Sequence, residues 1–312
     1  MSLRATPAAA PNELPRTYYH WTTRLAPDTT ARRLLREAAA DRLYVKAFDV
    51  SWVAGLAEPT ALVEAVDTTG LPALIPVVFL TNEVFQRQPP RQLDSLAGLV
   101  LGLTENLLGP GFPELQIDCD WTATTRPAFF AFLTALRQRL GDRRLSCTVR
   151  LHQYRDRERQ GIPPVDRGAL MAYNTGNLND WATENSIVDT SVVKQYLAGN
   201  DPYPLPLDLA VAVYDWAAVY RRDRLAYLVN EPPLDELADT TRFAVLDAHG
   251  LRYAVRQGTY LDGTYLYAED RIRREIAPPE AVGEQVKLLR RYVAYDPEQR
   301  VILYRLGSRL WR

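Results

Sequence analysis

The sequence predicts an α/β protein in which eight parallel strands alternate with helices and close into a barrel. Three observations lead to this prediction. Eight short apolar segments have the length and pattern of buried strands, and amphipathic helical segments separate most of them. Several of the eight end in acidic or aromatic residues, as strands do at the active face of a (β/α)8 TIM barrel. A length of 312 residues also suits one such domain.

The expected strands recur along the whole chain. Segment 73–80 (ALIPVVFL) is a continuous apolar run, which is typical of a parallel strand buried on both faces. Eight strands separated mostly by helices is the number that closes a barrel. In order, the strands are expected at 16–21, 42–49, 73–80, 114–121, 145–151, 169–173, 207–214 and 300–306.

Helical segments are expected between these strands. The first, at about 28–40, begins at the N-cap candidate Asp28. The helix after the fourth strand follows the N-cap candidates Thr124 and Thr125 and has Pro127 in its first turn. The other helices are expected at about 61–66, 91–107, 188–197 and 279–292.

The fourth strand carries two acids close to its C-terminal end. Alternate side chains of a strand point the same way, so Asp118 and Asp120 share one face while Cys119 and Trp121 share the other. The two carboxylates would then lie about 6.6 Å apart along the strand, at roughly 3.3 Å per residue. This spacing makes them a candidate acid pair.

The pattern changes after the seventh strand. Short strand-like segments follow one another, and Asp262-Gly263 is a dipeptide typical of two-residue hairpin turns. We therefore expect 217–270 to be a small β-rich insertion within a barrel domain of 16–312. Residues 1–15 lack the apolar core of a signal peptide and are expected to form a flexible tail. A chain from which an export signal was removed could start in the same way.

Composition excludes several classes of function. A net charge of −1, from 37 basic and 38 acidic residues, gives no electrostatic footprint for nucleic acid. No apolar run reaches the roughly 18 residues of a membrane span. Phosphate-binding glycine loops and zinc-ligand spacings are absent, so no cofactor or metal is expected. Cys119 and Cys147 are expected to be two buried thiols, with a disulfide as the alternative.

The ends of the strands carry the expected site. Paired carboxylates allow one group to donate a proton while the other stays ionised. Aromatic rings and amides suit a sugar, whose ring offers C–H faces and hydroxyl edges. A carbohydrate ligand is therefore the expected partner, and protein partners stay open. The expected substrate-binding residues are Trp21, Asp49, His152, Tyr154, Tyr173, Asn174, Tyr214, Asp215 and Trp216.

Two short motifs carry a resemblance to a known family. Segment 117–121 (IDCDW) resembles the fourth-strand motif of the family 18 chitinase group, in which alternating acids and a Trp precede the catalytic Glu. Segment 171–174 (MAYN) resembles the sixth-strand Met-x-Tyr-Asp of that group. From about 18 to 306, the chain is also similar to bacterial glycoside-hydrolase-like TIM barrels of unknown function. The resemblance implies a glycosidase-type site at the C-terminal face of the barrel.

The chain departs from both motifs at the position of the acid. Thr122 occupies the position of the proton-donating Glu, and Asn174 occupies the position of the Asp. The catalytic candidates are therefore Asp118 and Asp120, with Glu83 as an alternative proton donor. Asp215 is the next alternative donor after Glu83.

Three hypotheses remain. The first is a glycoside hydrolase acting on a poly- or oligosaccharide, with Asp120 as stabiliser or acid and Asp118 tuning its pKa. The second is a glycan-binding or scaffold barrel that has lost the acid, which Thr122 and Asn174 favour. Asp118 has the alternative interpretation of a buried structural acid. The third is that the insertion at 217–270 docks a partner protein.

Overall fold

The computed structural model of the chain describes residues 13–309, so the expected tail at 1–15 lies almost entirely outside the described residues. The described chain forms two compact units. The first consists of residues 13–171, 196–210 and 286–306, and the second of residues 172–195, 211–285 and 307–309.

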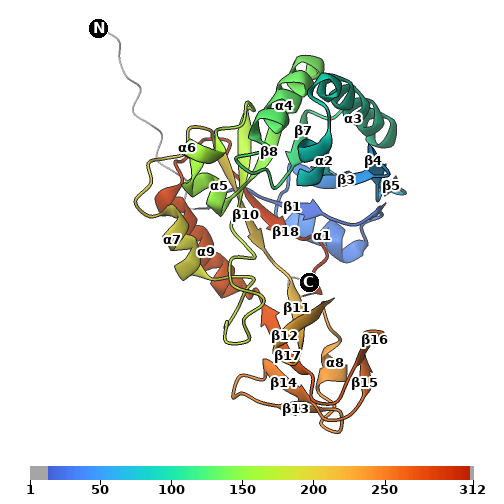
Figure 1. Ribbon diagram of the computed structural model, residues 1–312, viewed down its shortest axis with the longest axis vertical. Helices are drawn as coiled ribbons and strands as arrows, with labels where there is room; N and C mark the ends of the chain where they lie inside the picture. The colour runs from blue at the N-terminus through green and yellow to red at the C-terminus, as the bar shows by residue number, and fades with distance from the viewer. Residues whose placement is uncertain (1–12, 310–312) are drawn as a thin grey trace. The chain divides into compact units, whose positions relative to one another are not determined.

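Eight parallel strands form a closed barrel (Figure 1). The barrel closes because β1 pairs in parallel with both β18 and β3. This confirms the predicted (β/α)8 fold. The strands are β1 (Arg16–His20), β3 (Arg42–Val53), β6 (Ala73–Leu80), β7 (Glu114–Asp118), β8 (Arg144–Arg150), β9 (Arg167–Met171), β10 (Leu207–Ala212) and β18 (Val301–Tyr304).

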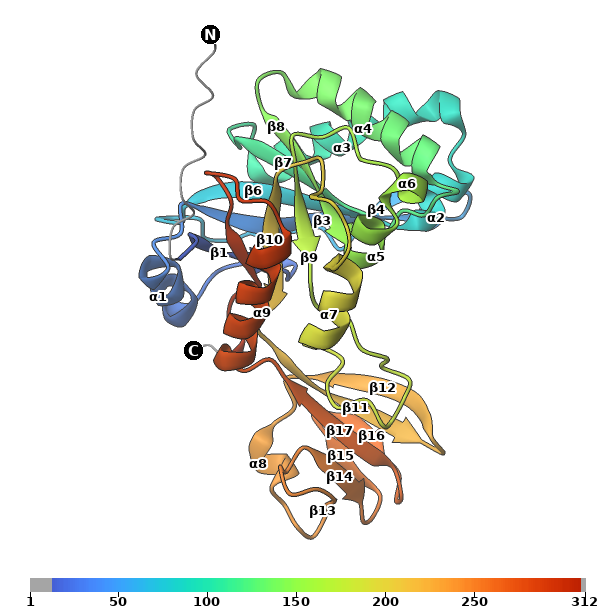
Figure 2. The same ribbon diagram turned by 90° about the vertical axis from the view of Figure 1, so that its left-hand side faces the viewer.

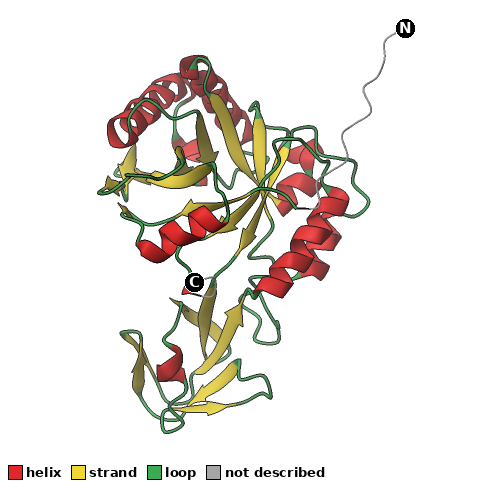
Figure 3. Cartoon of the chain, turned by 180° about the vertical axis from the view of Figure 1, so that it is seen from behind, coloured by secondary structure: helices red, strands yellow, loops and turns green. Residues whose placement is uncertain are grey.

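Helices separate the strands of the barrel everywhere except between β3 and β6, and α3 and α4 pack side by side outside it (Figure 3). The predicted cap of α1 is confirmed, since Oδ1 of Asp28 accepts a hydrogen bond from the backbone N–H of Ala31 at 2.7 Å. The helices are α1 (Thr29–Glu37), α2 (Asn82–Arg87), η1 (Pro90–Gln92), α3 (Leu93–Leu108), α4 (Arg126–Leu140), α5 (Leu151–Arg155), α6 (Arg157–Gln160), α7 (Thr190–Leu197) and α9 (Pro279–Tyr292).

The short helix expected at 61–66 is wrong. Strand β3 continues to Val53, and the chain turns back into β4 (Leu56–Thr60), which pairs with β3 in antiparallel fashion. The turn residues Ala54 and Gly55 both have positive φ, at 48° and 91°, as a tight hairpin requires. After it, β5 (Glu64–Ala65) pairs with β2 (Arg24–Leu25). Pairing with distant strands has therefore overridden a weak local helical pattern.

The segment that follows β7 builds much of the core on the outside of the barrel. Trp121 is fully buried, its indole N–H donates to the backbone oxygen of Gln160 at 3.0 Å, and its ring stacks on Phe129 at 5.2 Å. Trp121 thus packs against α4. Cys119 and Cys147 are buried free thiols, as predicted.

The second unit contains a five-stranded antiparallel sheet with the order β12-β11-β17-β14-β13 (Figure 2). A separate hairpin of β15 and β16 turns at Asp262 and Gly263, the dipeptide that predicted it. The elements are β11 (Asp215–Arg221), β12 (Arg224–Asn230), α8 (Leu234–Leu237), β13 (Phe243–Val245), β14 (Arg252–Val255), β15 (Thr259–Leu261), β16 (Thr264–Leu266) and β17 (Arg271–Ile276).

Candidate functional site

Asp118 is the last residue of β7 and lies inside the protein with 4% of its surface exposed. The parallel pairing of β7 and β8 brings Thr148 beside it, and the Thr148 hydroxyl donates to Oδ1 of Asp118 at 2.6 Å. Burial raises the pKa of Asp118 to about 6, and the negative charges of Asp120 and Asp49 act in the same direction. The positive charge of Arg150 and the hydrogen bond from Thr148 limit the rise.

Asp120 lies beyond the end of β7 and forms a bidentate ion pair with Arg150, the last residue of β8. The Nε–Oδ1 distance is 2.5 Å and the Nη2–Oδ2 distance is 3.1 Å. The two side chains are 48% and 27% exposed, so solvent screens the pair only in part. Both oxygens of Asp120 are therefore occupied by one guanidinium.

Asp49 and Lys46 form a second ion pair at this end of the barrel, with Nζ and Oδ2 2.7 Å apart. Residues three apart on a regular strand point to opposite faces. Here β3 contains a bulge, because its register with β6 shifts between Lys46 and Phe48. The bulge brings the two side chains together. Oδ1 of Asp49 is buried and has no hydrogen-bond partner among the described residues.

Aromatic rings from β1 and β18 adjoin these charges. The ring of Trp21 lies 5.8 Å from that of Tyr19 and 5.7 Å from that of Tyr304, and the ammonium group of Lys46 lies 5.7 Å from the Trp21 ring. Trp21 and Tyr304 are partly exposed. Burial raises the pKa of Tyr304 to about 12, and the charge of Asp118 contributes to that rise. The barrel thus presents aromatic rings and paired charges at one end.

Glu83, the expected alternative donor, lies in the first turn of α2. Its side chain is 46% exposed and pairs with Arg87 one helical turn later, with Nε and Oε1 2.8 Å apart. Glu83 and Arg87 therefore form an ordinary ion pair along the exposed side of α2.

His152, expected at the end of the fifth strand, lies on a helix, because β8 ends at Arg150 and α5 begins at Leu151. The imidazole is partly buried. Burial lowers the pKa of His152, while the negative charge of Asp120 opposes this shift. His152 is consequently placed near Asp120 but on a helix.

Tyr154, expected to contact substrate, is a core residue. It is fully buried in α5, its ring stacks on that of Tyr203 at 5.3 Å, and its hydroxyl donates to the backbone oxygen of Tyr292 at 3.4 Å. These contacts leave no ring face for a ligand. Sequence position alone placed Tyr154 at a strand end, but in the structure it packs between helix α5 and its neighbours.

The remaining predicted residues lie in the second unit. The Tyr214 hydroxyl donates to Oδ1 of Asn174, which has a positive φ of 54°. Asn174 follows the buried Tyr173. The indole N–H of Trp216 donates to Oε2 of Glu275 at 2.9 Å. These hydrogen bonds all join residues of the second unit.

Asp215 also belongs to the second unit and is fully buried. Its Oδ2 lies 2.5 Å from a guanidinium nitrogen of Arg309 and 3.4 Å from one of Arg274. Two cations and full burial engage this carboxylate, which argues against the proton-donor role considered for it.

Arg150, Lys46 and Tyr304 were missed as site residues. The sequence contained a signal for Arg150, because alternation along strand 145–151 places it on the same face as Thr148. The signal for Lys46 was hidden by the bulge. Tyr304 stands two residues before the end of its expected strand and looked like part of the barrel wall.

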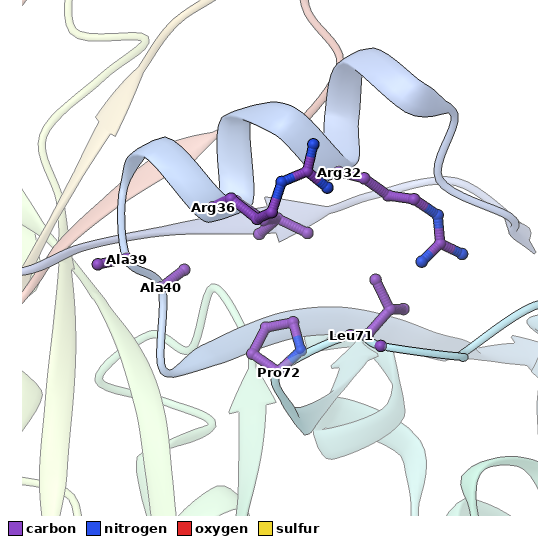
Figure 4. A pocket seen from close by; sticks show the side chains of 8 residues that line it. Arg32, Arg36, Ala39, Ala40, Leu71 and Pro72 are labelled. Atoms are coloured by element: carbon purple, nitrogen blue, oxygen red, sulfur yellow. The ribbon is translucent and has the colours of Figure 1, made fainter.

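A hollow of about 270 Å³ lies elsewhere on the first unit. Figure 4 shows Arg32 and Arg36 of α1 on one side of it and Leu71 and Pro72 on the other. No predicted site residue lines it, so it is separate from the candidate site.

Within 13–309, no helix is both long and apolar enough to cross a lipid bilayer. The same part of the chain contains no group of three or more His, Cys, Asp or Glu side chains arranged to hold a metal ion.

Comparison with known proteins identifies the fold. No family model matches this chain, and no curated protein matches it in sequence. The Bacillus cereus spore cortex-lytic enzyme SleL superimposes with a TM-score of 0.54 at 14% identity, covering 96% of this chain and 73% of that one. A chitinase from Chromobacterium violaceum superimposes with a TM-score of 0.50 at 12% identity, covering 96% of each chain. The predicted similarity to chitinase-type barrels is confirmed at the level of the fold.

Proposed function

We propose that the barrel binds a saccharide at the carboxyl ends of its strands and recognises the glycan without cleaving it. The main observation behind this proposal is that Asp120 and Asp49, two partly exposed carboxylates at this end of the barrel, each pair with a cation. Asp120 is held by Arg150 and Asp49 by Lys46. A carboxylate engaged by a cation is not free to protonate a sugar, whereas a fixed ion pair offers both donors and acceptors to sugar hydroxyls.

Aromatic side chains support a saccharide as the ligand. Trp21 and Tyr304 are partly exposed beside these ion pairs. The C–H face of a pyranose packs on such rings, while its hydroxyl edge meets the charged groups. The names of the two solved structures with this fold, a chitinase and a cortex-lytic enzyme, make glycans of that kind the first ligands to test.

The motif position of the acid supports recognition over hydrolysis. Thr122 stands there, and its hydroxyl lies 2.9 Å from that of Thr124 and 3.2 Å from that of Thr125. A threonine hydroxyl does not donate a proton as a general acid near neutral pH. Glu83, the alternative donor, is engaged by Arg87.

One observation favours hydrolysis as a second candidate. The pKa of Asp118, about 6, lies where a general acid works near neutral pH. In that case Asp118 would donate the proton and Asp120 would stabilise positive charge on the sugar. Hydrolysis also requires two carboxyl groups about 5 to 9.5 Å apart on either side of the bond that is cleaved. Asp118 is only 4% exposed, which is why we place this candidate second.

The test combines binding and turnover on one panel of soluble ligands. Chitin oligosaccharides and peptidoglycan glycan fragments are titrated by calorimetry, and the products are followed by mass spectrometry. The proteins are wild type, Trp21→Ala, Asp118→Asn and Asp120→Asn, with Glu83→Gln as the control for loss of a surface carboxylate.

We expect wild type to bind without forming products and Trp21→Ala to bind about tenfold more weakly, because a stacking ring is lost. Cleavage by wild type that disappears in Asp118→Asn or Asp120→Asn would establish the hydrolase instead. Absence of binding to every ligand, or equal binding by Trp21→Ala, contradicts the proposal.

A further inference from the structure

Three tyrosines are the most exposed aromatic side chains of residues 13–309. Tyr260 is 60% exposed, Tyr265 is 43% exposed and Tyr267 is 54% exposed. All three belong to the β15–β16 hairpin of the second unit or directly follow it (Figure 1). Exposed aromatic rings that cluster in this way are uncommon unless they serve binding.

The register of the hairpin places the three rings on one face. Tyr260 pairs directly with Tyr265, so both point the same way, and Tyr267 has the same parity as Tyr265. Ring centroids are 5.1 Å apart for Tyr260 and Tyr265, and 5.0 Å apart for Tyr265 and Tyr267. The opposite face carries Leu261 and Leu266, which are fully buried in the core of this unit. The hairpin is therefore anchored on one side and aromatic on the other.

Neighbouring residues hold the backbone of Tyr265 and Tyr267 in place. The Tyr227 hydroxyl donates to the backbone oxygen of Tyr265 at 2.5 Å. Asp270 accepts the backbone N–H of Tyr267 at 3.0 Å, and Arg221 pairs with both oxygens of Asp270 at 2.9 and 2.8 Å. The guanidinium carbon of Arg221 lies 4.1 Å from the centre of the Tyr267 ring. The backbone beneath this surface is therefore held in place before a ligand binds.

Glycine makes room for the middle ring. A Cβ atom at Gly258 would lie 2.3 Å from the Tyr265 hydroxyl oxygen, closer than any real contact. The ring of Tyr265 therefore lies against bare backbone, which fixes its direction. A residue with a side chain at position 258 would displace it.

A polar hollow adjoins the tyrosines. It has a volume of about 580 Å³, and its lining includes Tyr267. The charged residues around it balance, with three basic and three acidic side chains. They are Arg221, Arg222, Arg271, Asp223, Glu269 and Asp270.

We infer that the tyrosine face of the hairpin is a second saccharide-binding surface, and that it takes a neutral polysaccharide chain. The rings of Tyr260 and Tyr267, set edge-to-face with Tyr265 at interplanar angles of 69° and 86°, offer exposed apolar surface to sugar C–H groups. The balanced charges offer hydrogen bonds to hydroxyls without favouring an ionic ligand. A nucleic acid would need a net positive surface, which this hollow lacks. The inference rests on the proposed function, because a surface for long glycans belongs to a protein that recognises glycans.

The test measures retention of the full chain on insoluble chitin and microcrystalline cellulose. Tyr260→Ala and the double variant Tyr260→Ala/Tyr267→Ala remove rings, whereas Tyr260→Phe/Tyr267→Phe keeps them. Leu99→Ala is the matched control, since Leu99 is 70% exposed on α3 of the other unit. Thermal melts of each variant exclude unfolding as the cause of a loss.

We expect the double alanine variant to partition onto at least one polymer about tenfold less than wild type, with phenylalanine restoring retention. Its binding to soluble oligosaccharides should match wild type, which separates this surface from the barrel site. Equal retention of wild type and the double alanine variant, or no retention of wild type on either polymer, overturns the inference. Failure of Trp21→Ala to weaken oligosaccharide binding would instead count against the barrel site alone.

Discussion

Arg150 and Asp120 form a two-point ion pair across the ends of β8 and β7, at 2.5 Å and 3.1 Å. The pair gives two neighbouring acids, Asp120 and Asp118, different surroundings. Asp120 is bound by a cation near the surface, while Asp118, two residues earlier, is buried and has a pKa raised to about 6. Arg150 therefore shapes the electrostatic environment of both acids.

Removing that arginine should change the titration of the buried acid. Arg150 is the main influence that lowers the pKa of Asp118 against the effect of burial. In Arg150→Gln we expect the pKa of Asp118 to rise above its wild-type value, as followed by carboxyl-carbon NMR. Arg87→Gln, which frees Glu83 on α2, is the control and should leave the titration of Asp118 unchanged. An unchanged pKa in Arg150→Gln would show that the pair does not control Asp118.

Stability should depend on pH through Asp118. Its pKa in the native state is about 6 against an ordinary value of 3.8, so between these values the native state binds more protons than the unfolded state. The free energy of unfolding therefore falls as pH rises through this window, by up to about 3 kcal/mol for a shift of this size. Asp118→Asn removes this dependence and should be more favourable, relative to wild type, at pH 7.5 than at pH 4.

Urea denaturation of both proteins at the two pH values measures the effect. Glu83→Gln, a change at a half-exposed carboxylate, should show no comparable difference. Parallel pH profiles for wild type and Asp118→Asn would mean that the buried carboxyl titrates normally.

The second unit should depend strongly on Glu275. This residue is 1% exposed and accepts hydrogen bonds from Nε of Arg273 at 2.5 Å, from Trp216 at 2.9 Å and from the backbone N–H of Ser186 at 2.8 Å. Glu275→Gln leaves a buried guanidinium without a counter-charge, so we expect a loss of about 3 to 5 kcal/mol. Denaturation followed by tryptophan fluorescence reports on it, because the indole of Trp216 hydrogen-bonds to residue 275.

Asp223→Asn is the matched control for a surface pair. Asp223 pairs with Arg271 but is 82% exposed, so the loss should stay below about 1 kcal/mol. Similar losses in the two variants would mean that burial does not decide the strength of these pairs.

Two glycines should respond to alanine in opposite directions. At Gly168 of β9, a Cβ would lie 2.7 Å from Cδ2 of Leu207 and 3.1 Å from Cγ2 of Val149, so Gly168→Ala should cost about 1 to 3 kcal/mol through overpacking. At Gly102, within α3, a Cβ meets nothing within 4 Å. Gly102→Ala should therefore stabilise by about 0.5 to 1 kcal/mol. Thermal melts rank the two variants, and a stabilising Gly168→Ala would contradict the packing argument.

Local patterns were enough to predict most of the barrel. The third strand was expected at 73–80 and is Ala73–Leu80, and the last helix was expected at 279–292 and is Pro279–Tyr292. Continuous apolar runs and helical periodicity are properties of neighbouring residues, so the sequence shows them directly. The prediction of a helix at 61–66 was wrong because this stretch directly follows β4, which pairs with the earlier strand β3.

Local sequence patterns were enough to predict acids and aromatic residues at the ends of parallel strands, and hence a candidate site there. Tertiary structure decided which of them meet. The bulge in β3 turned Lys46 toward Asp49, helix packing buried Tyr154, and strand register joined Asp120 to Arg150, thirty residues away. Burial and pairing set the charge state of a carboxyl, and both depend on barrel closure between distant segments, which no local pattern encodes.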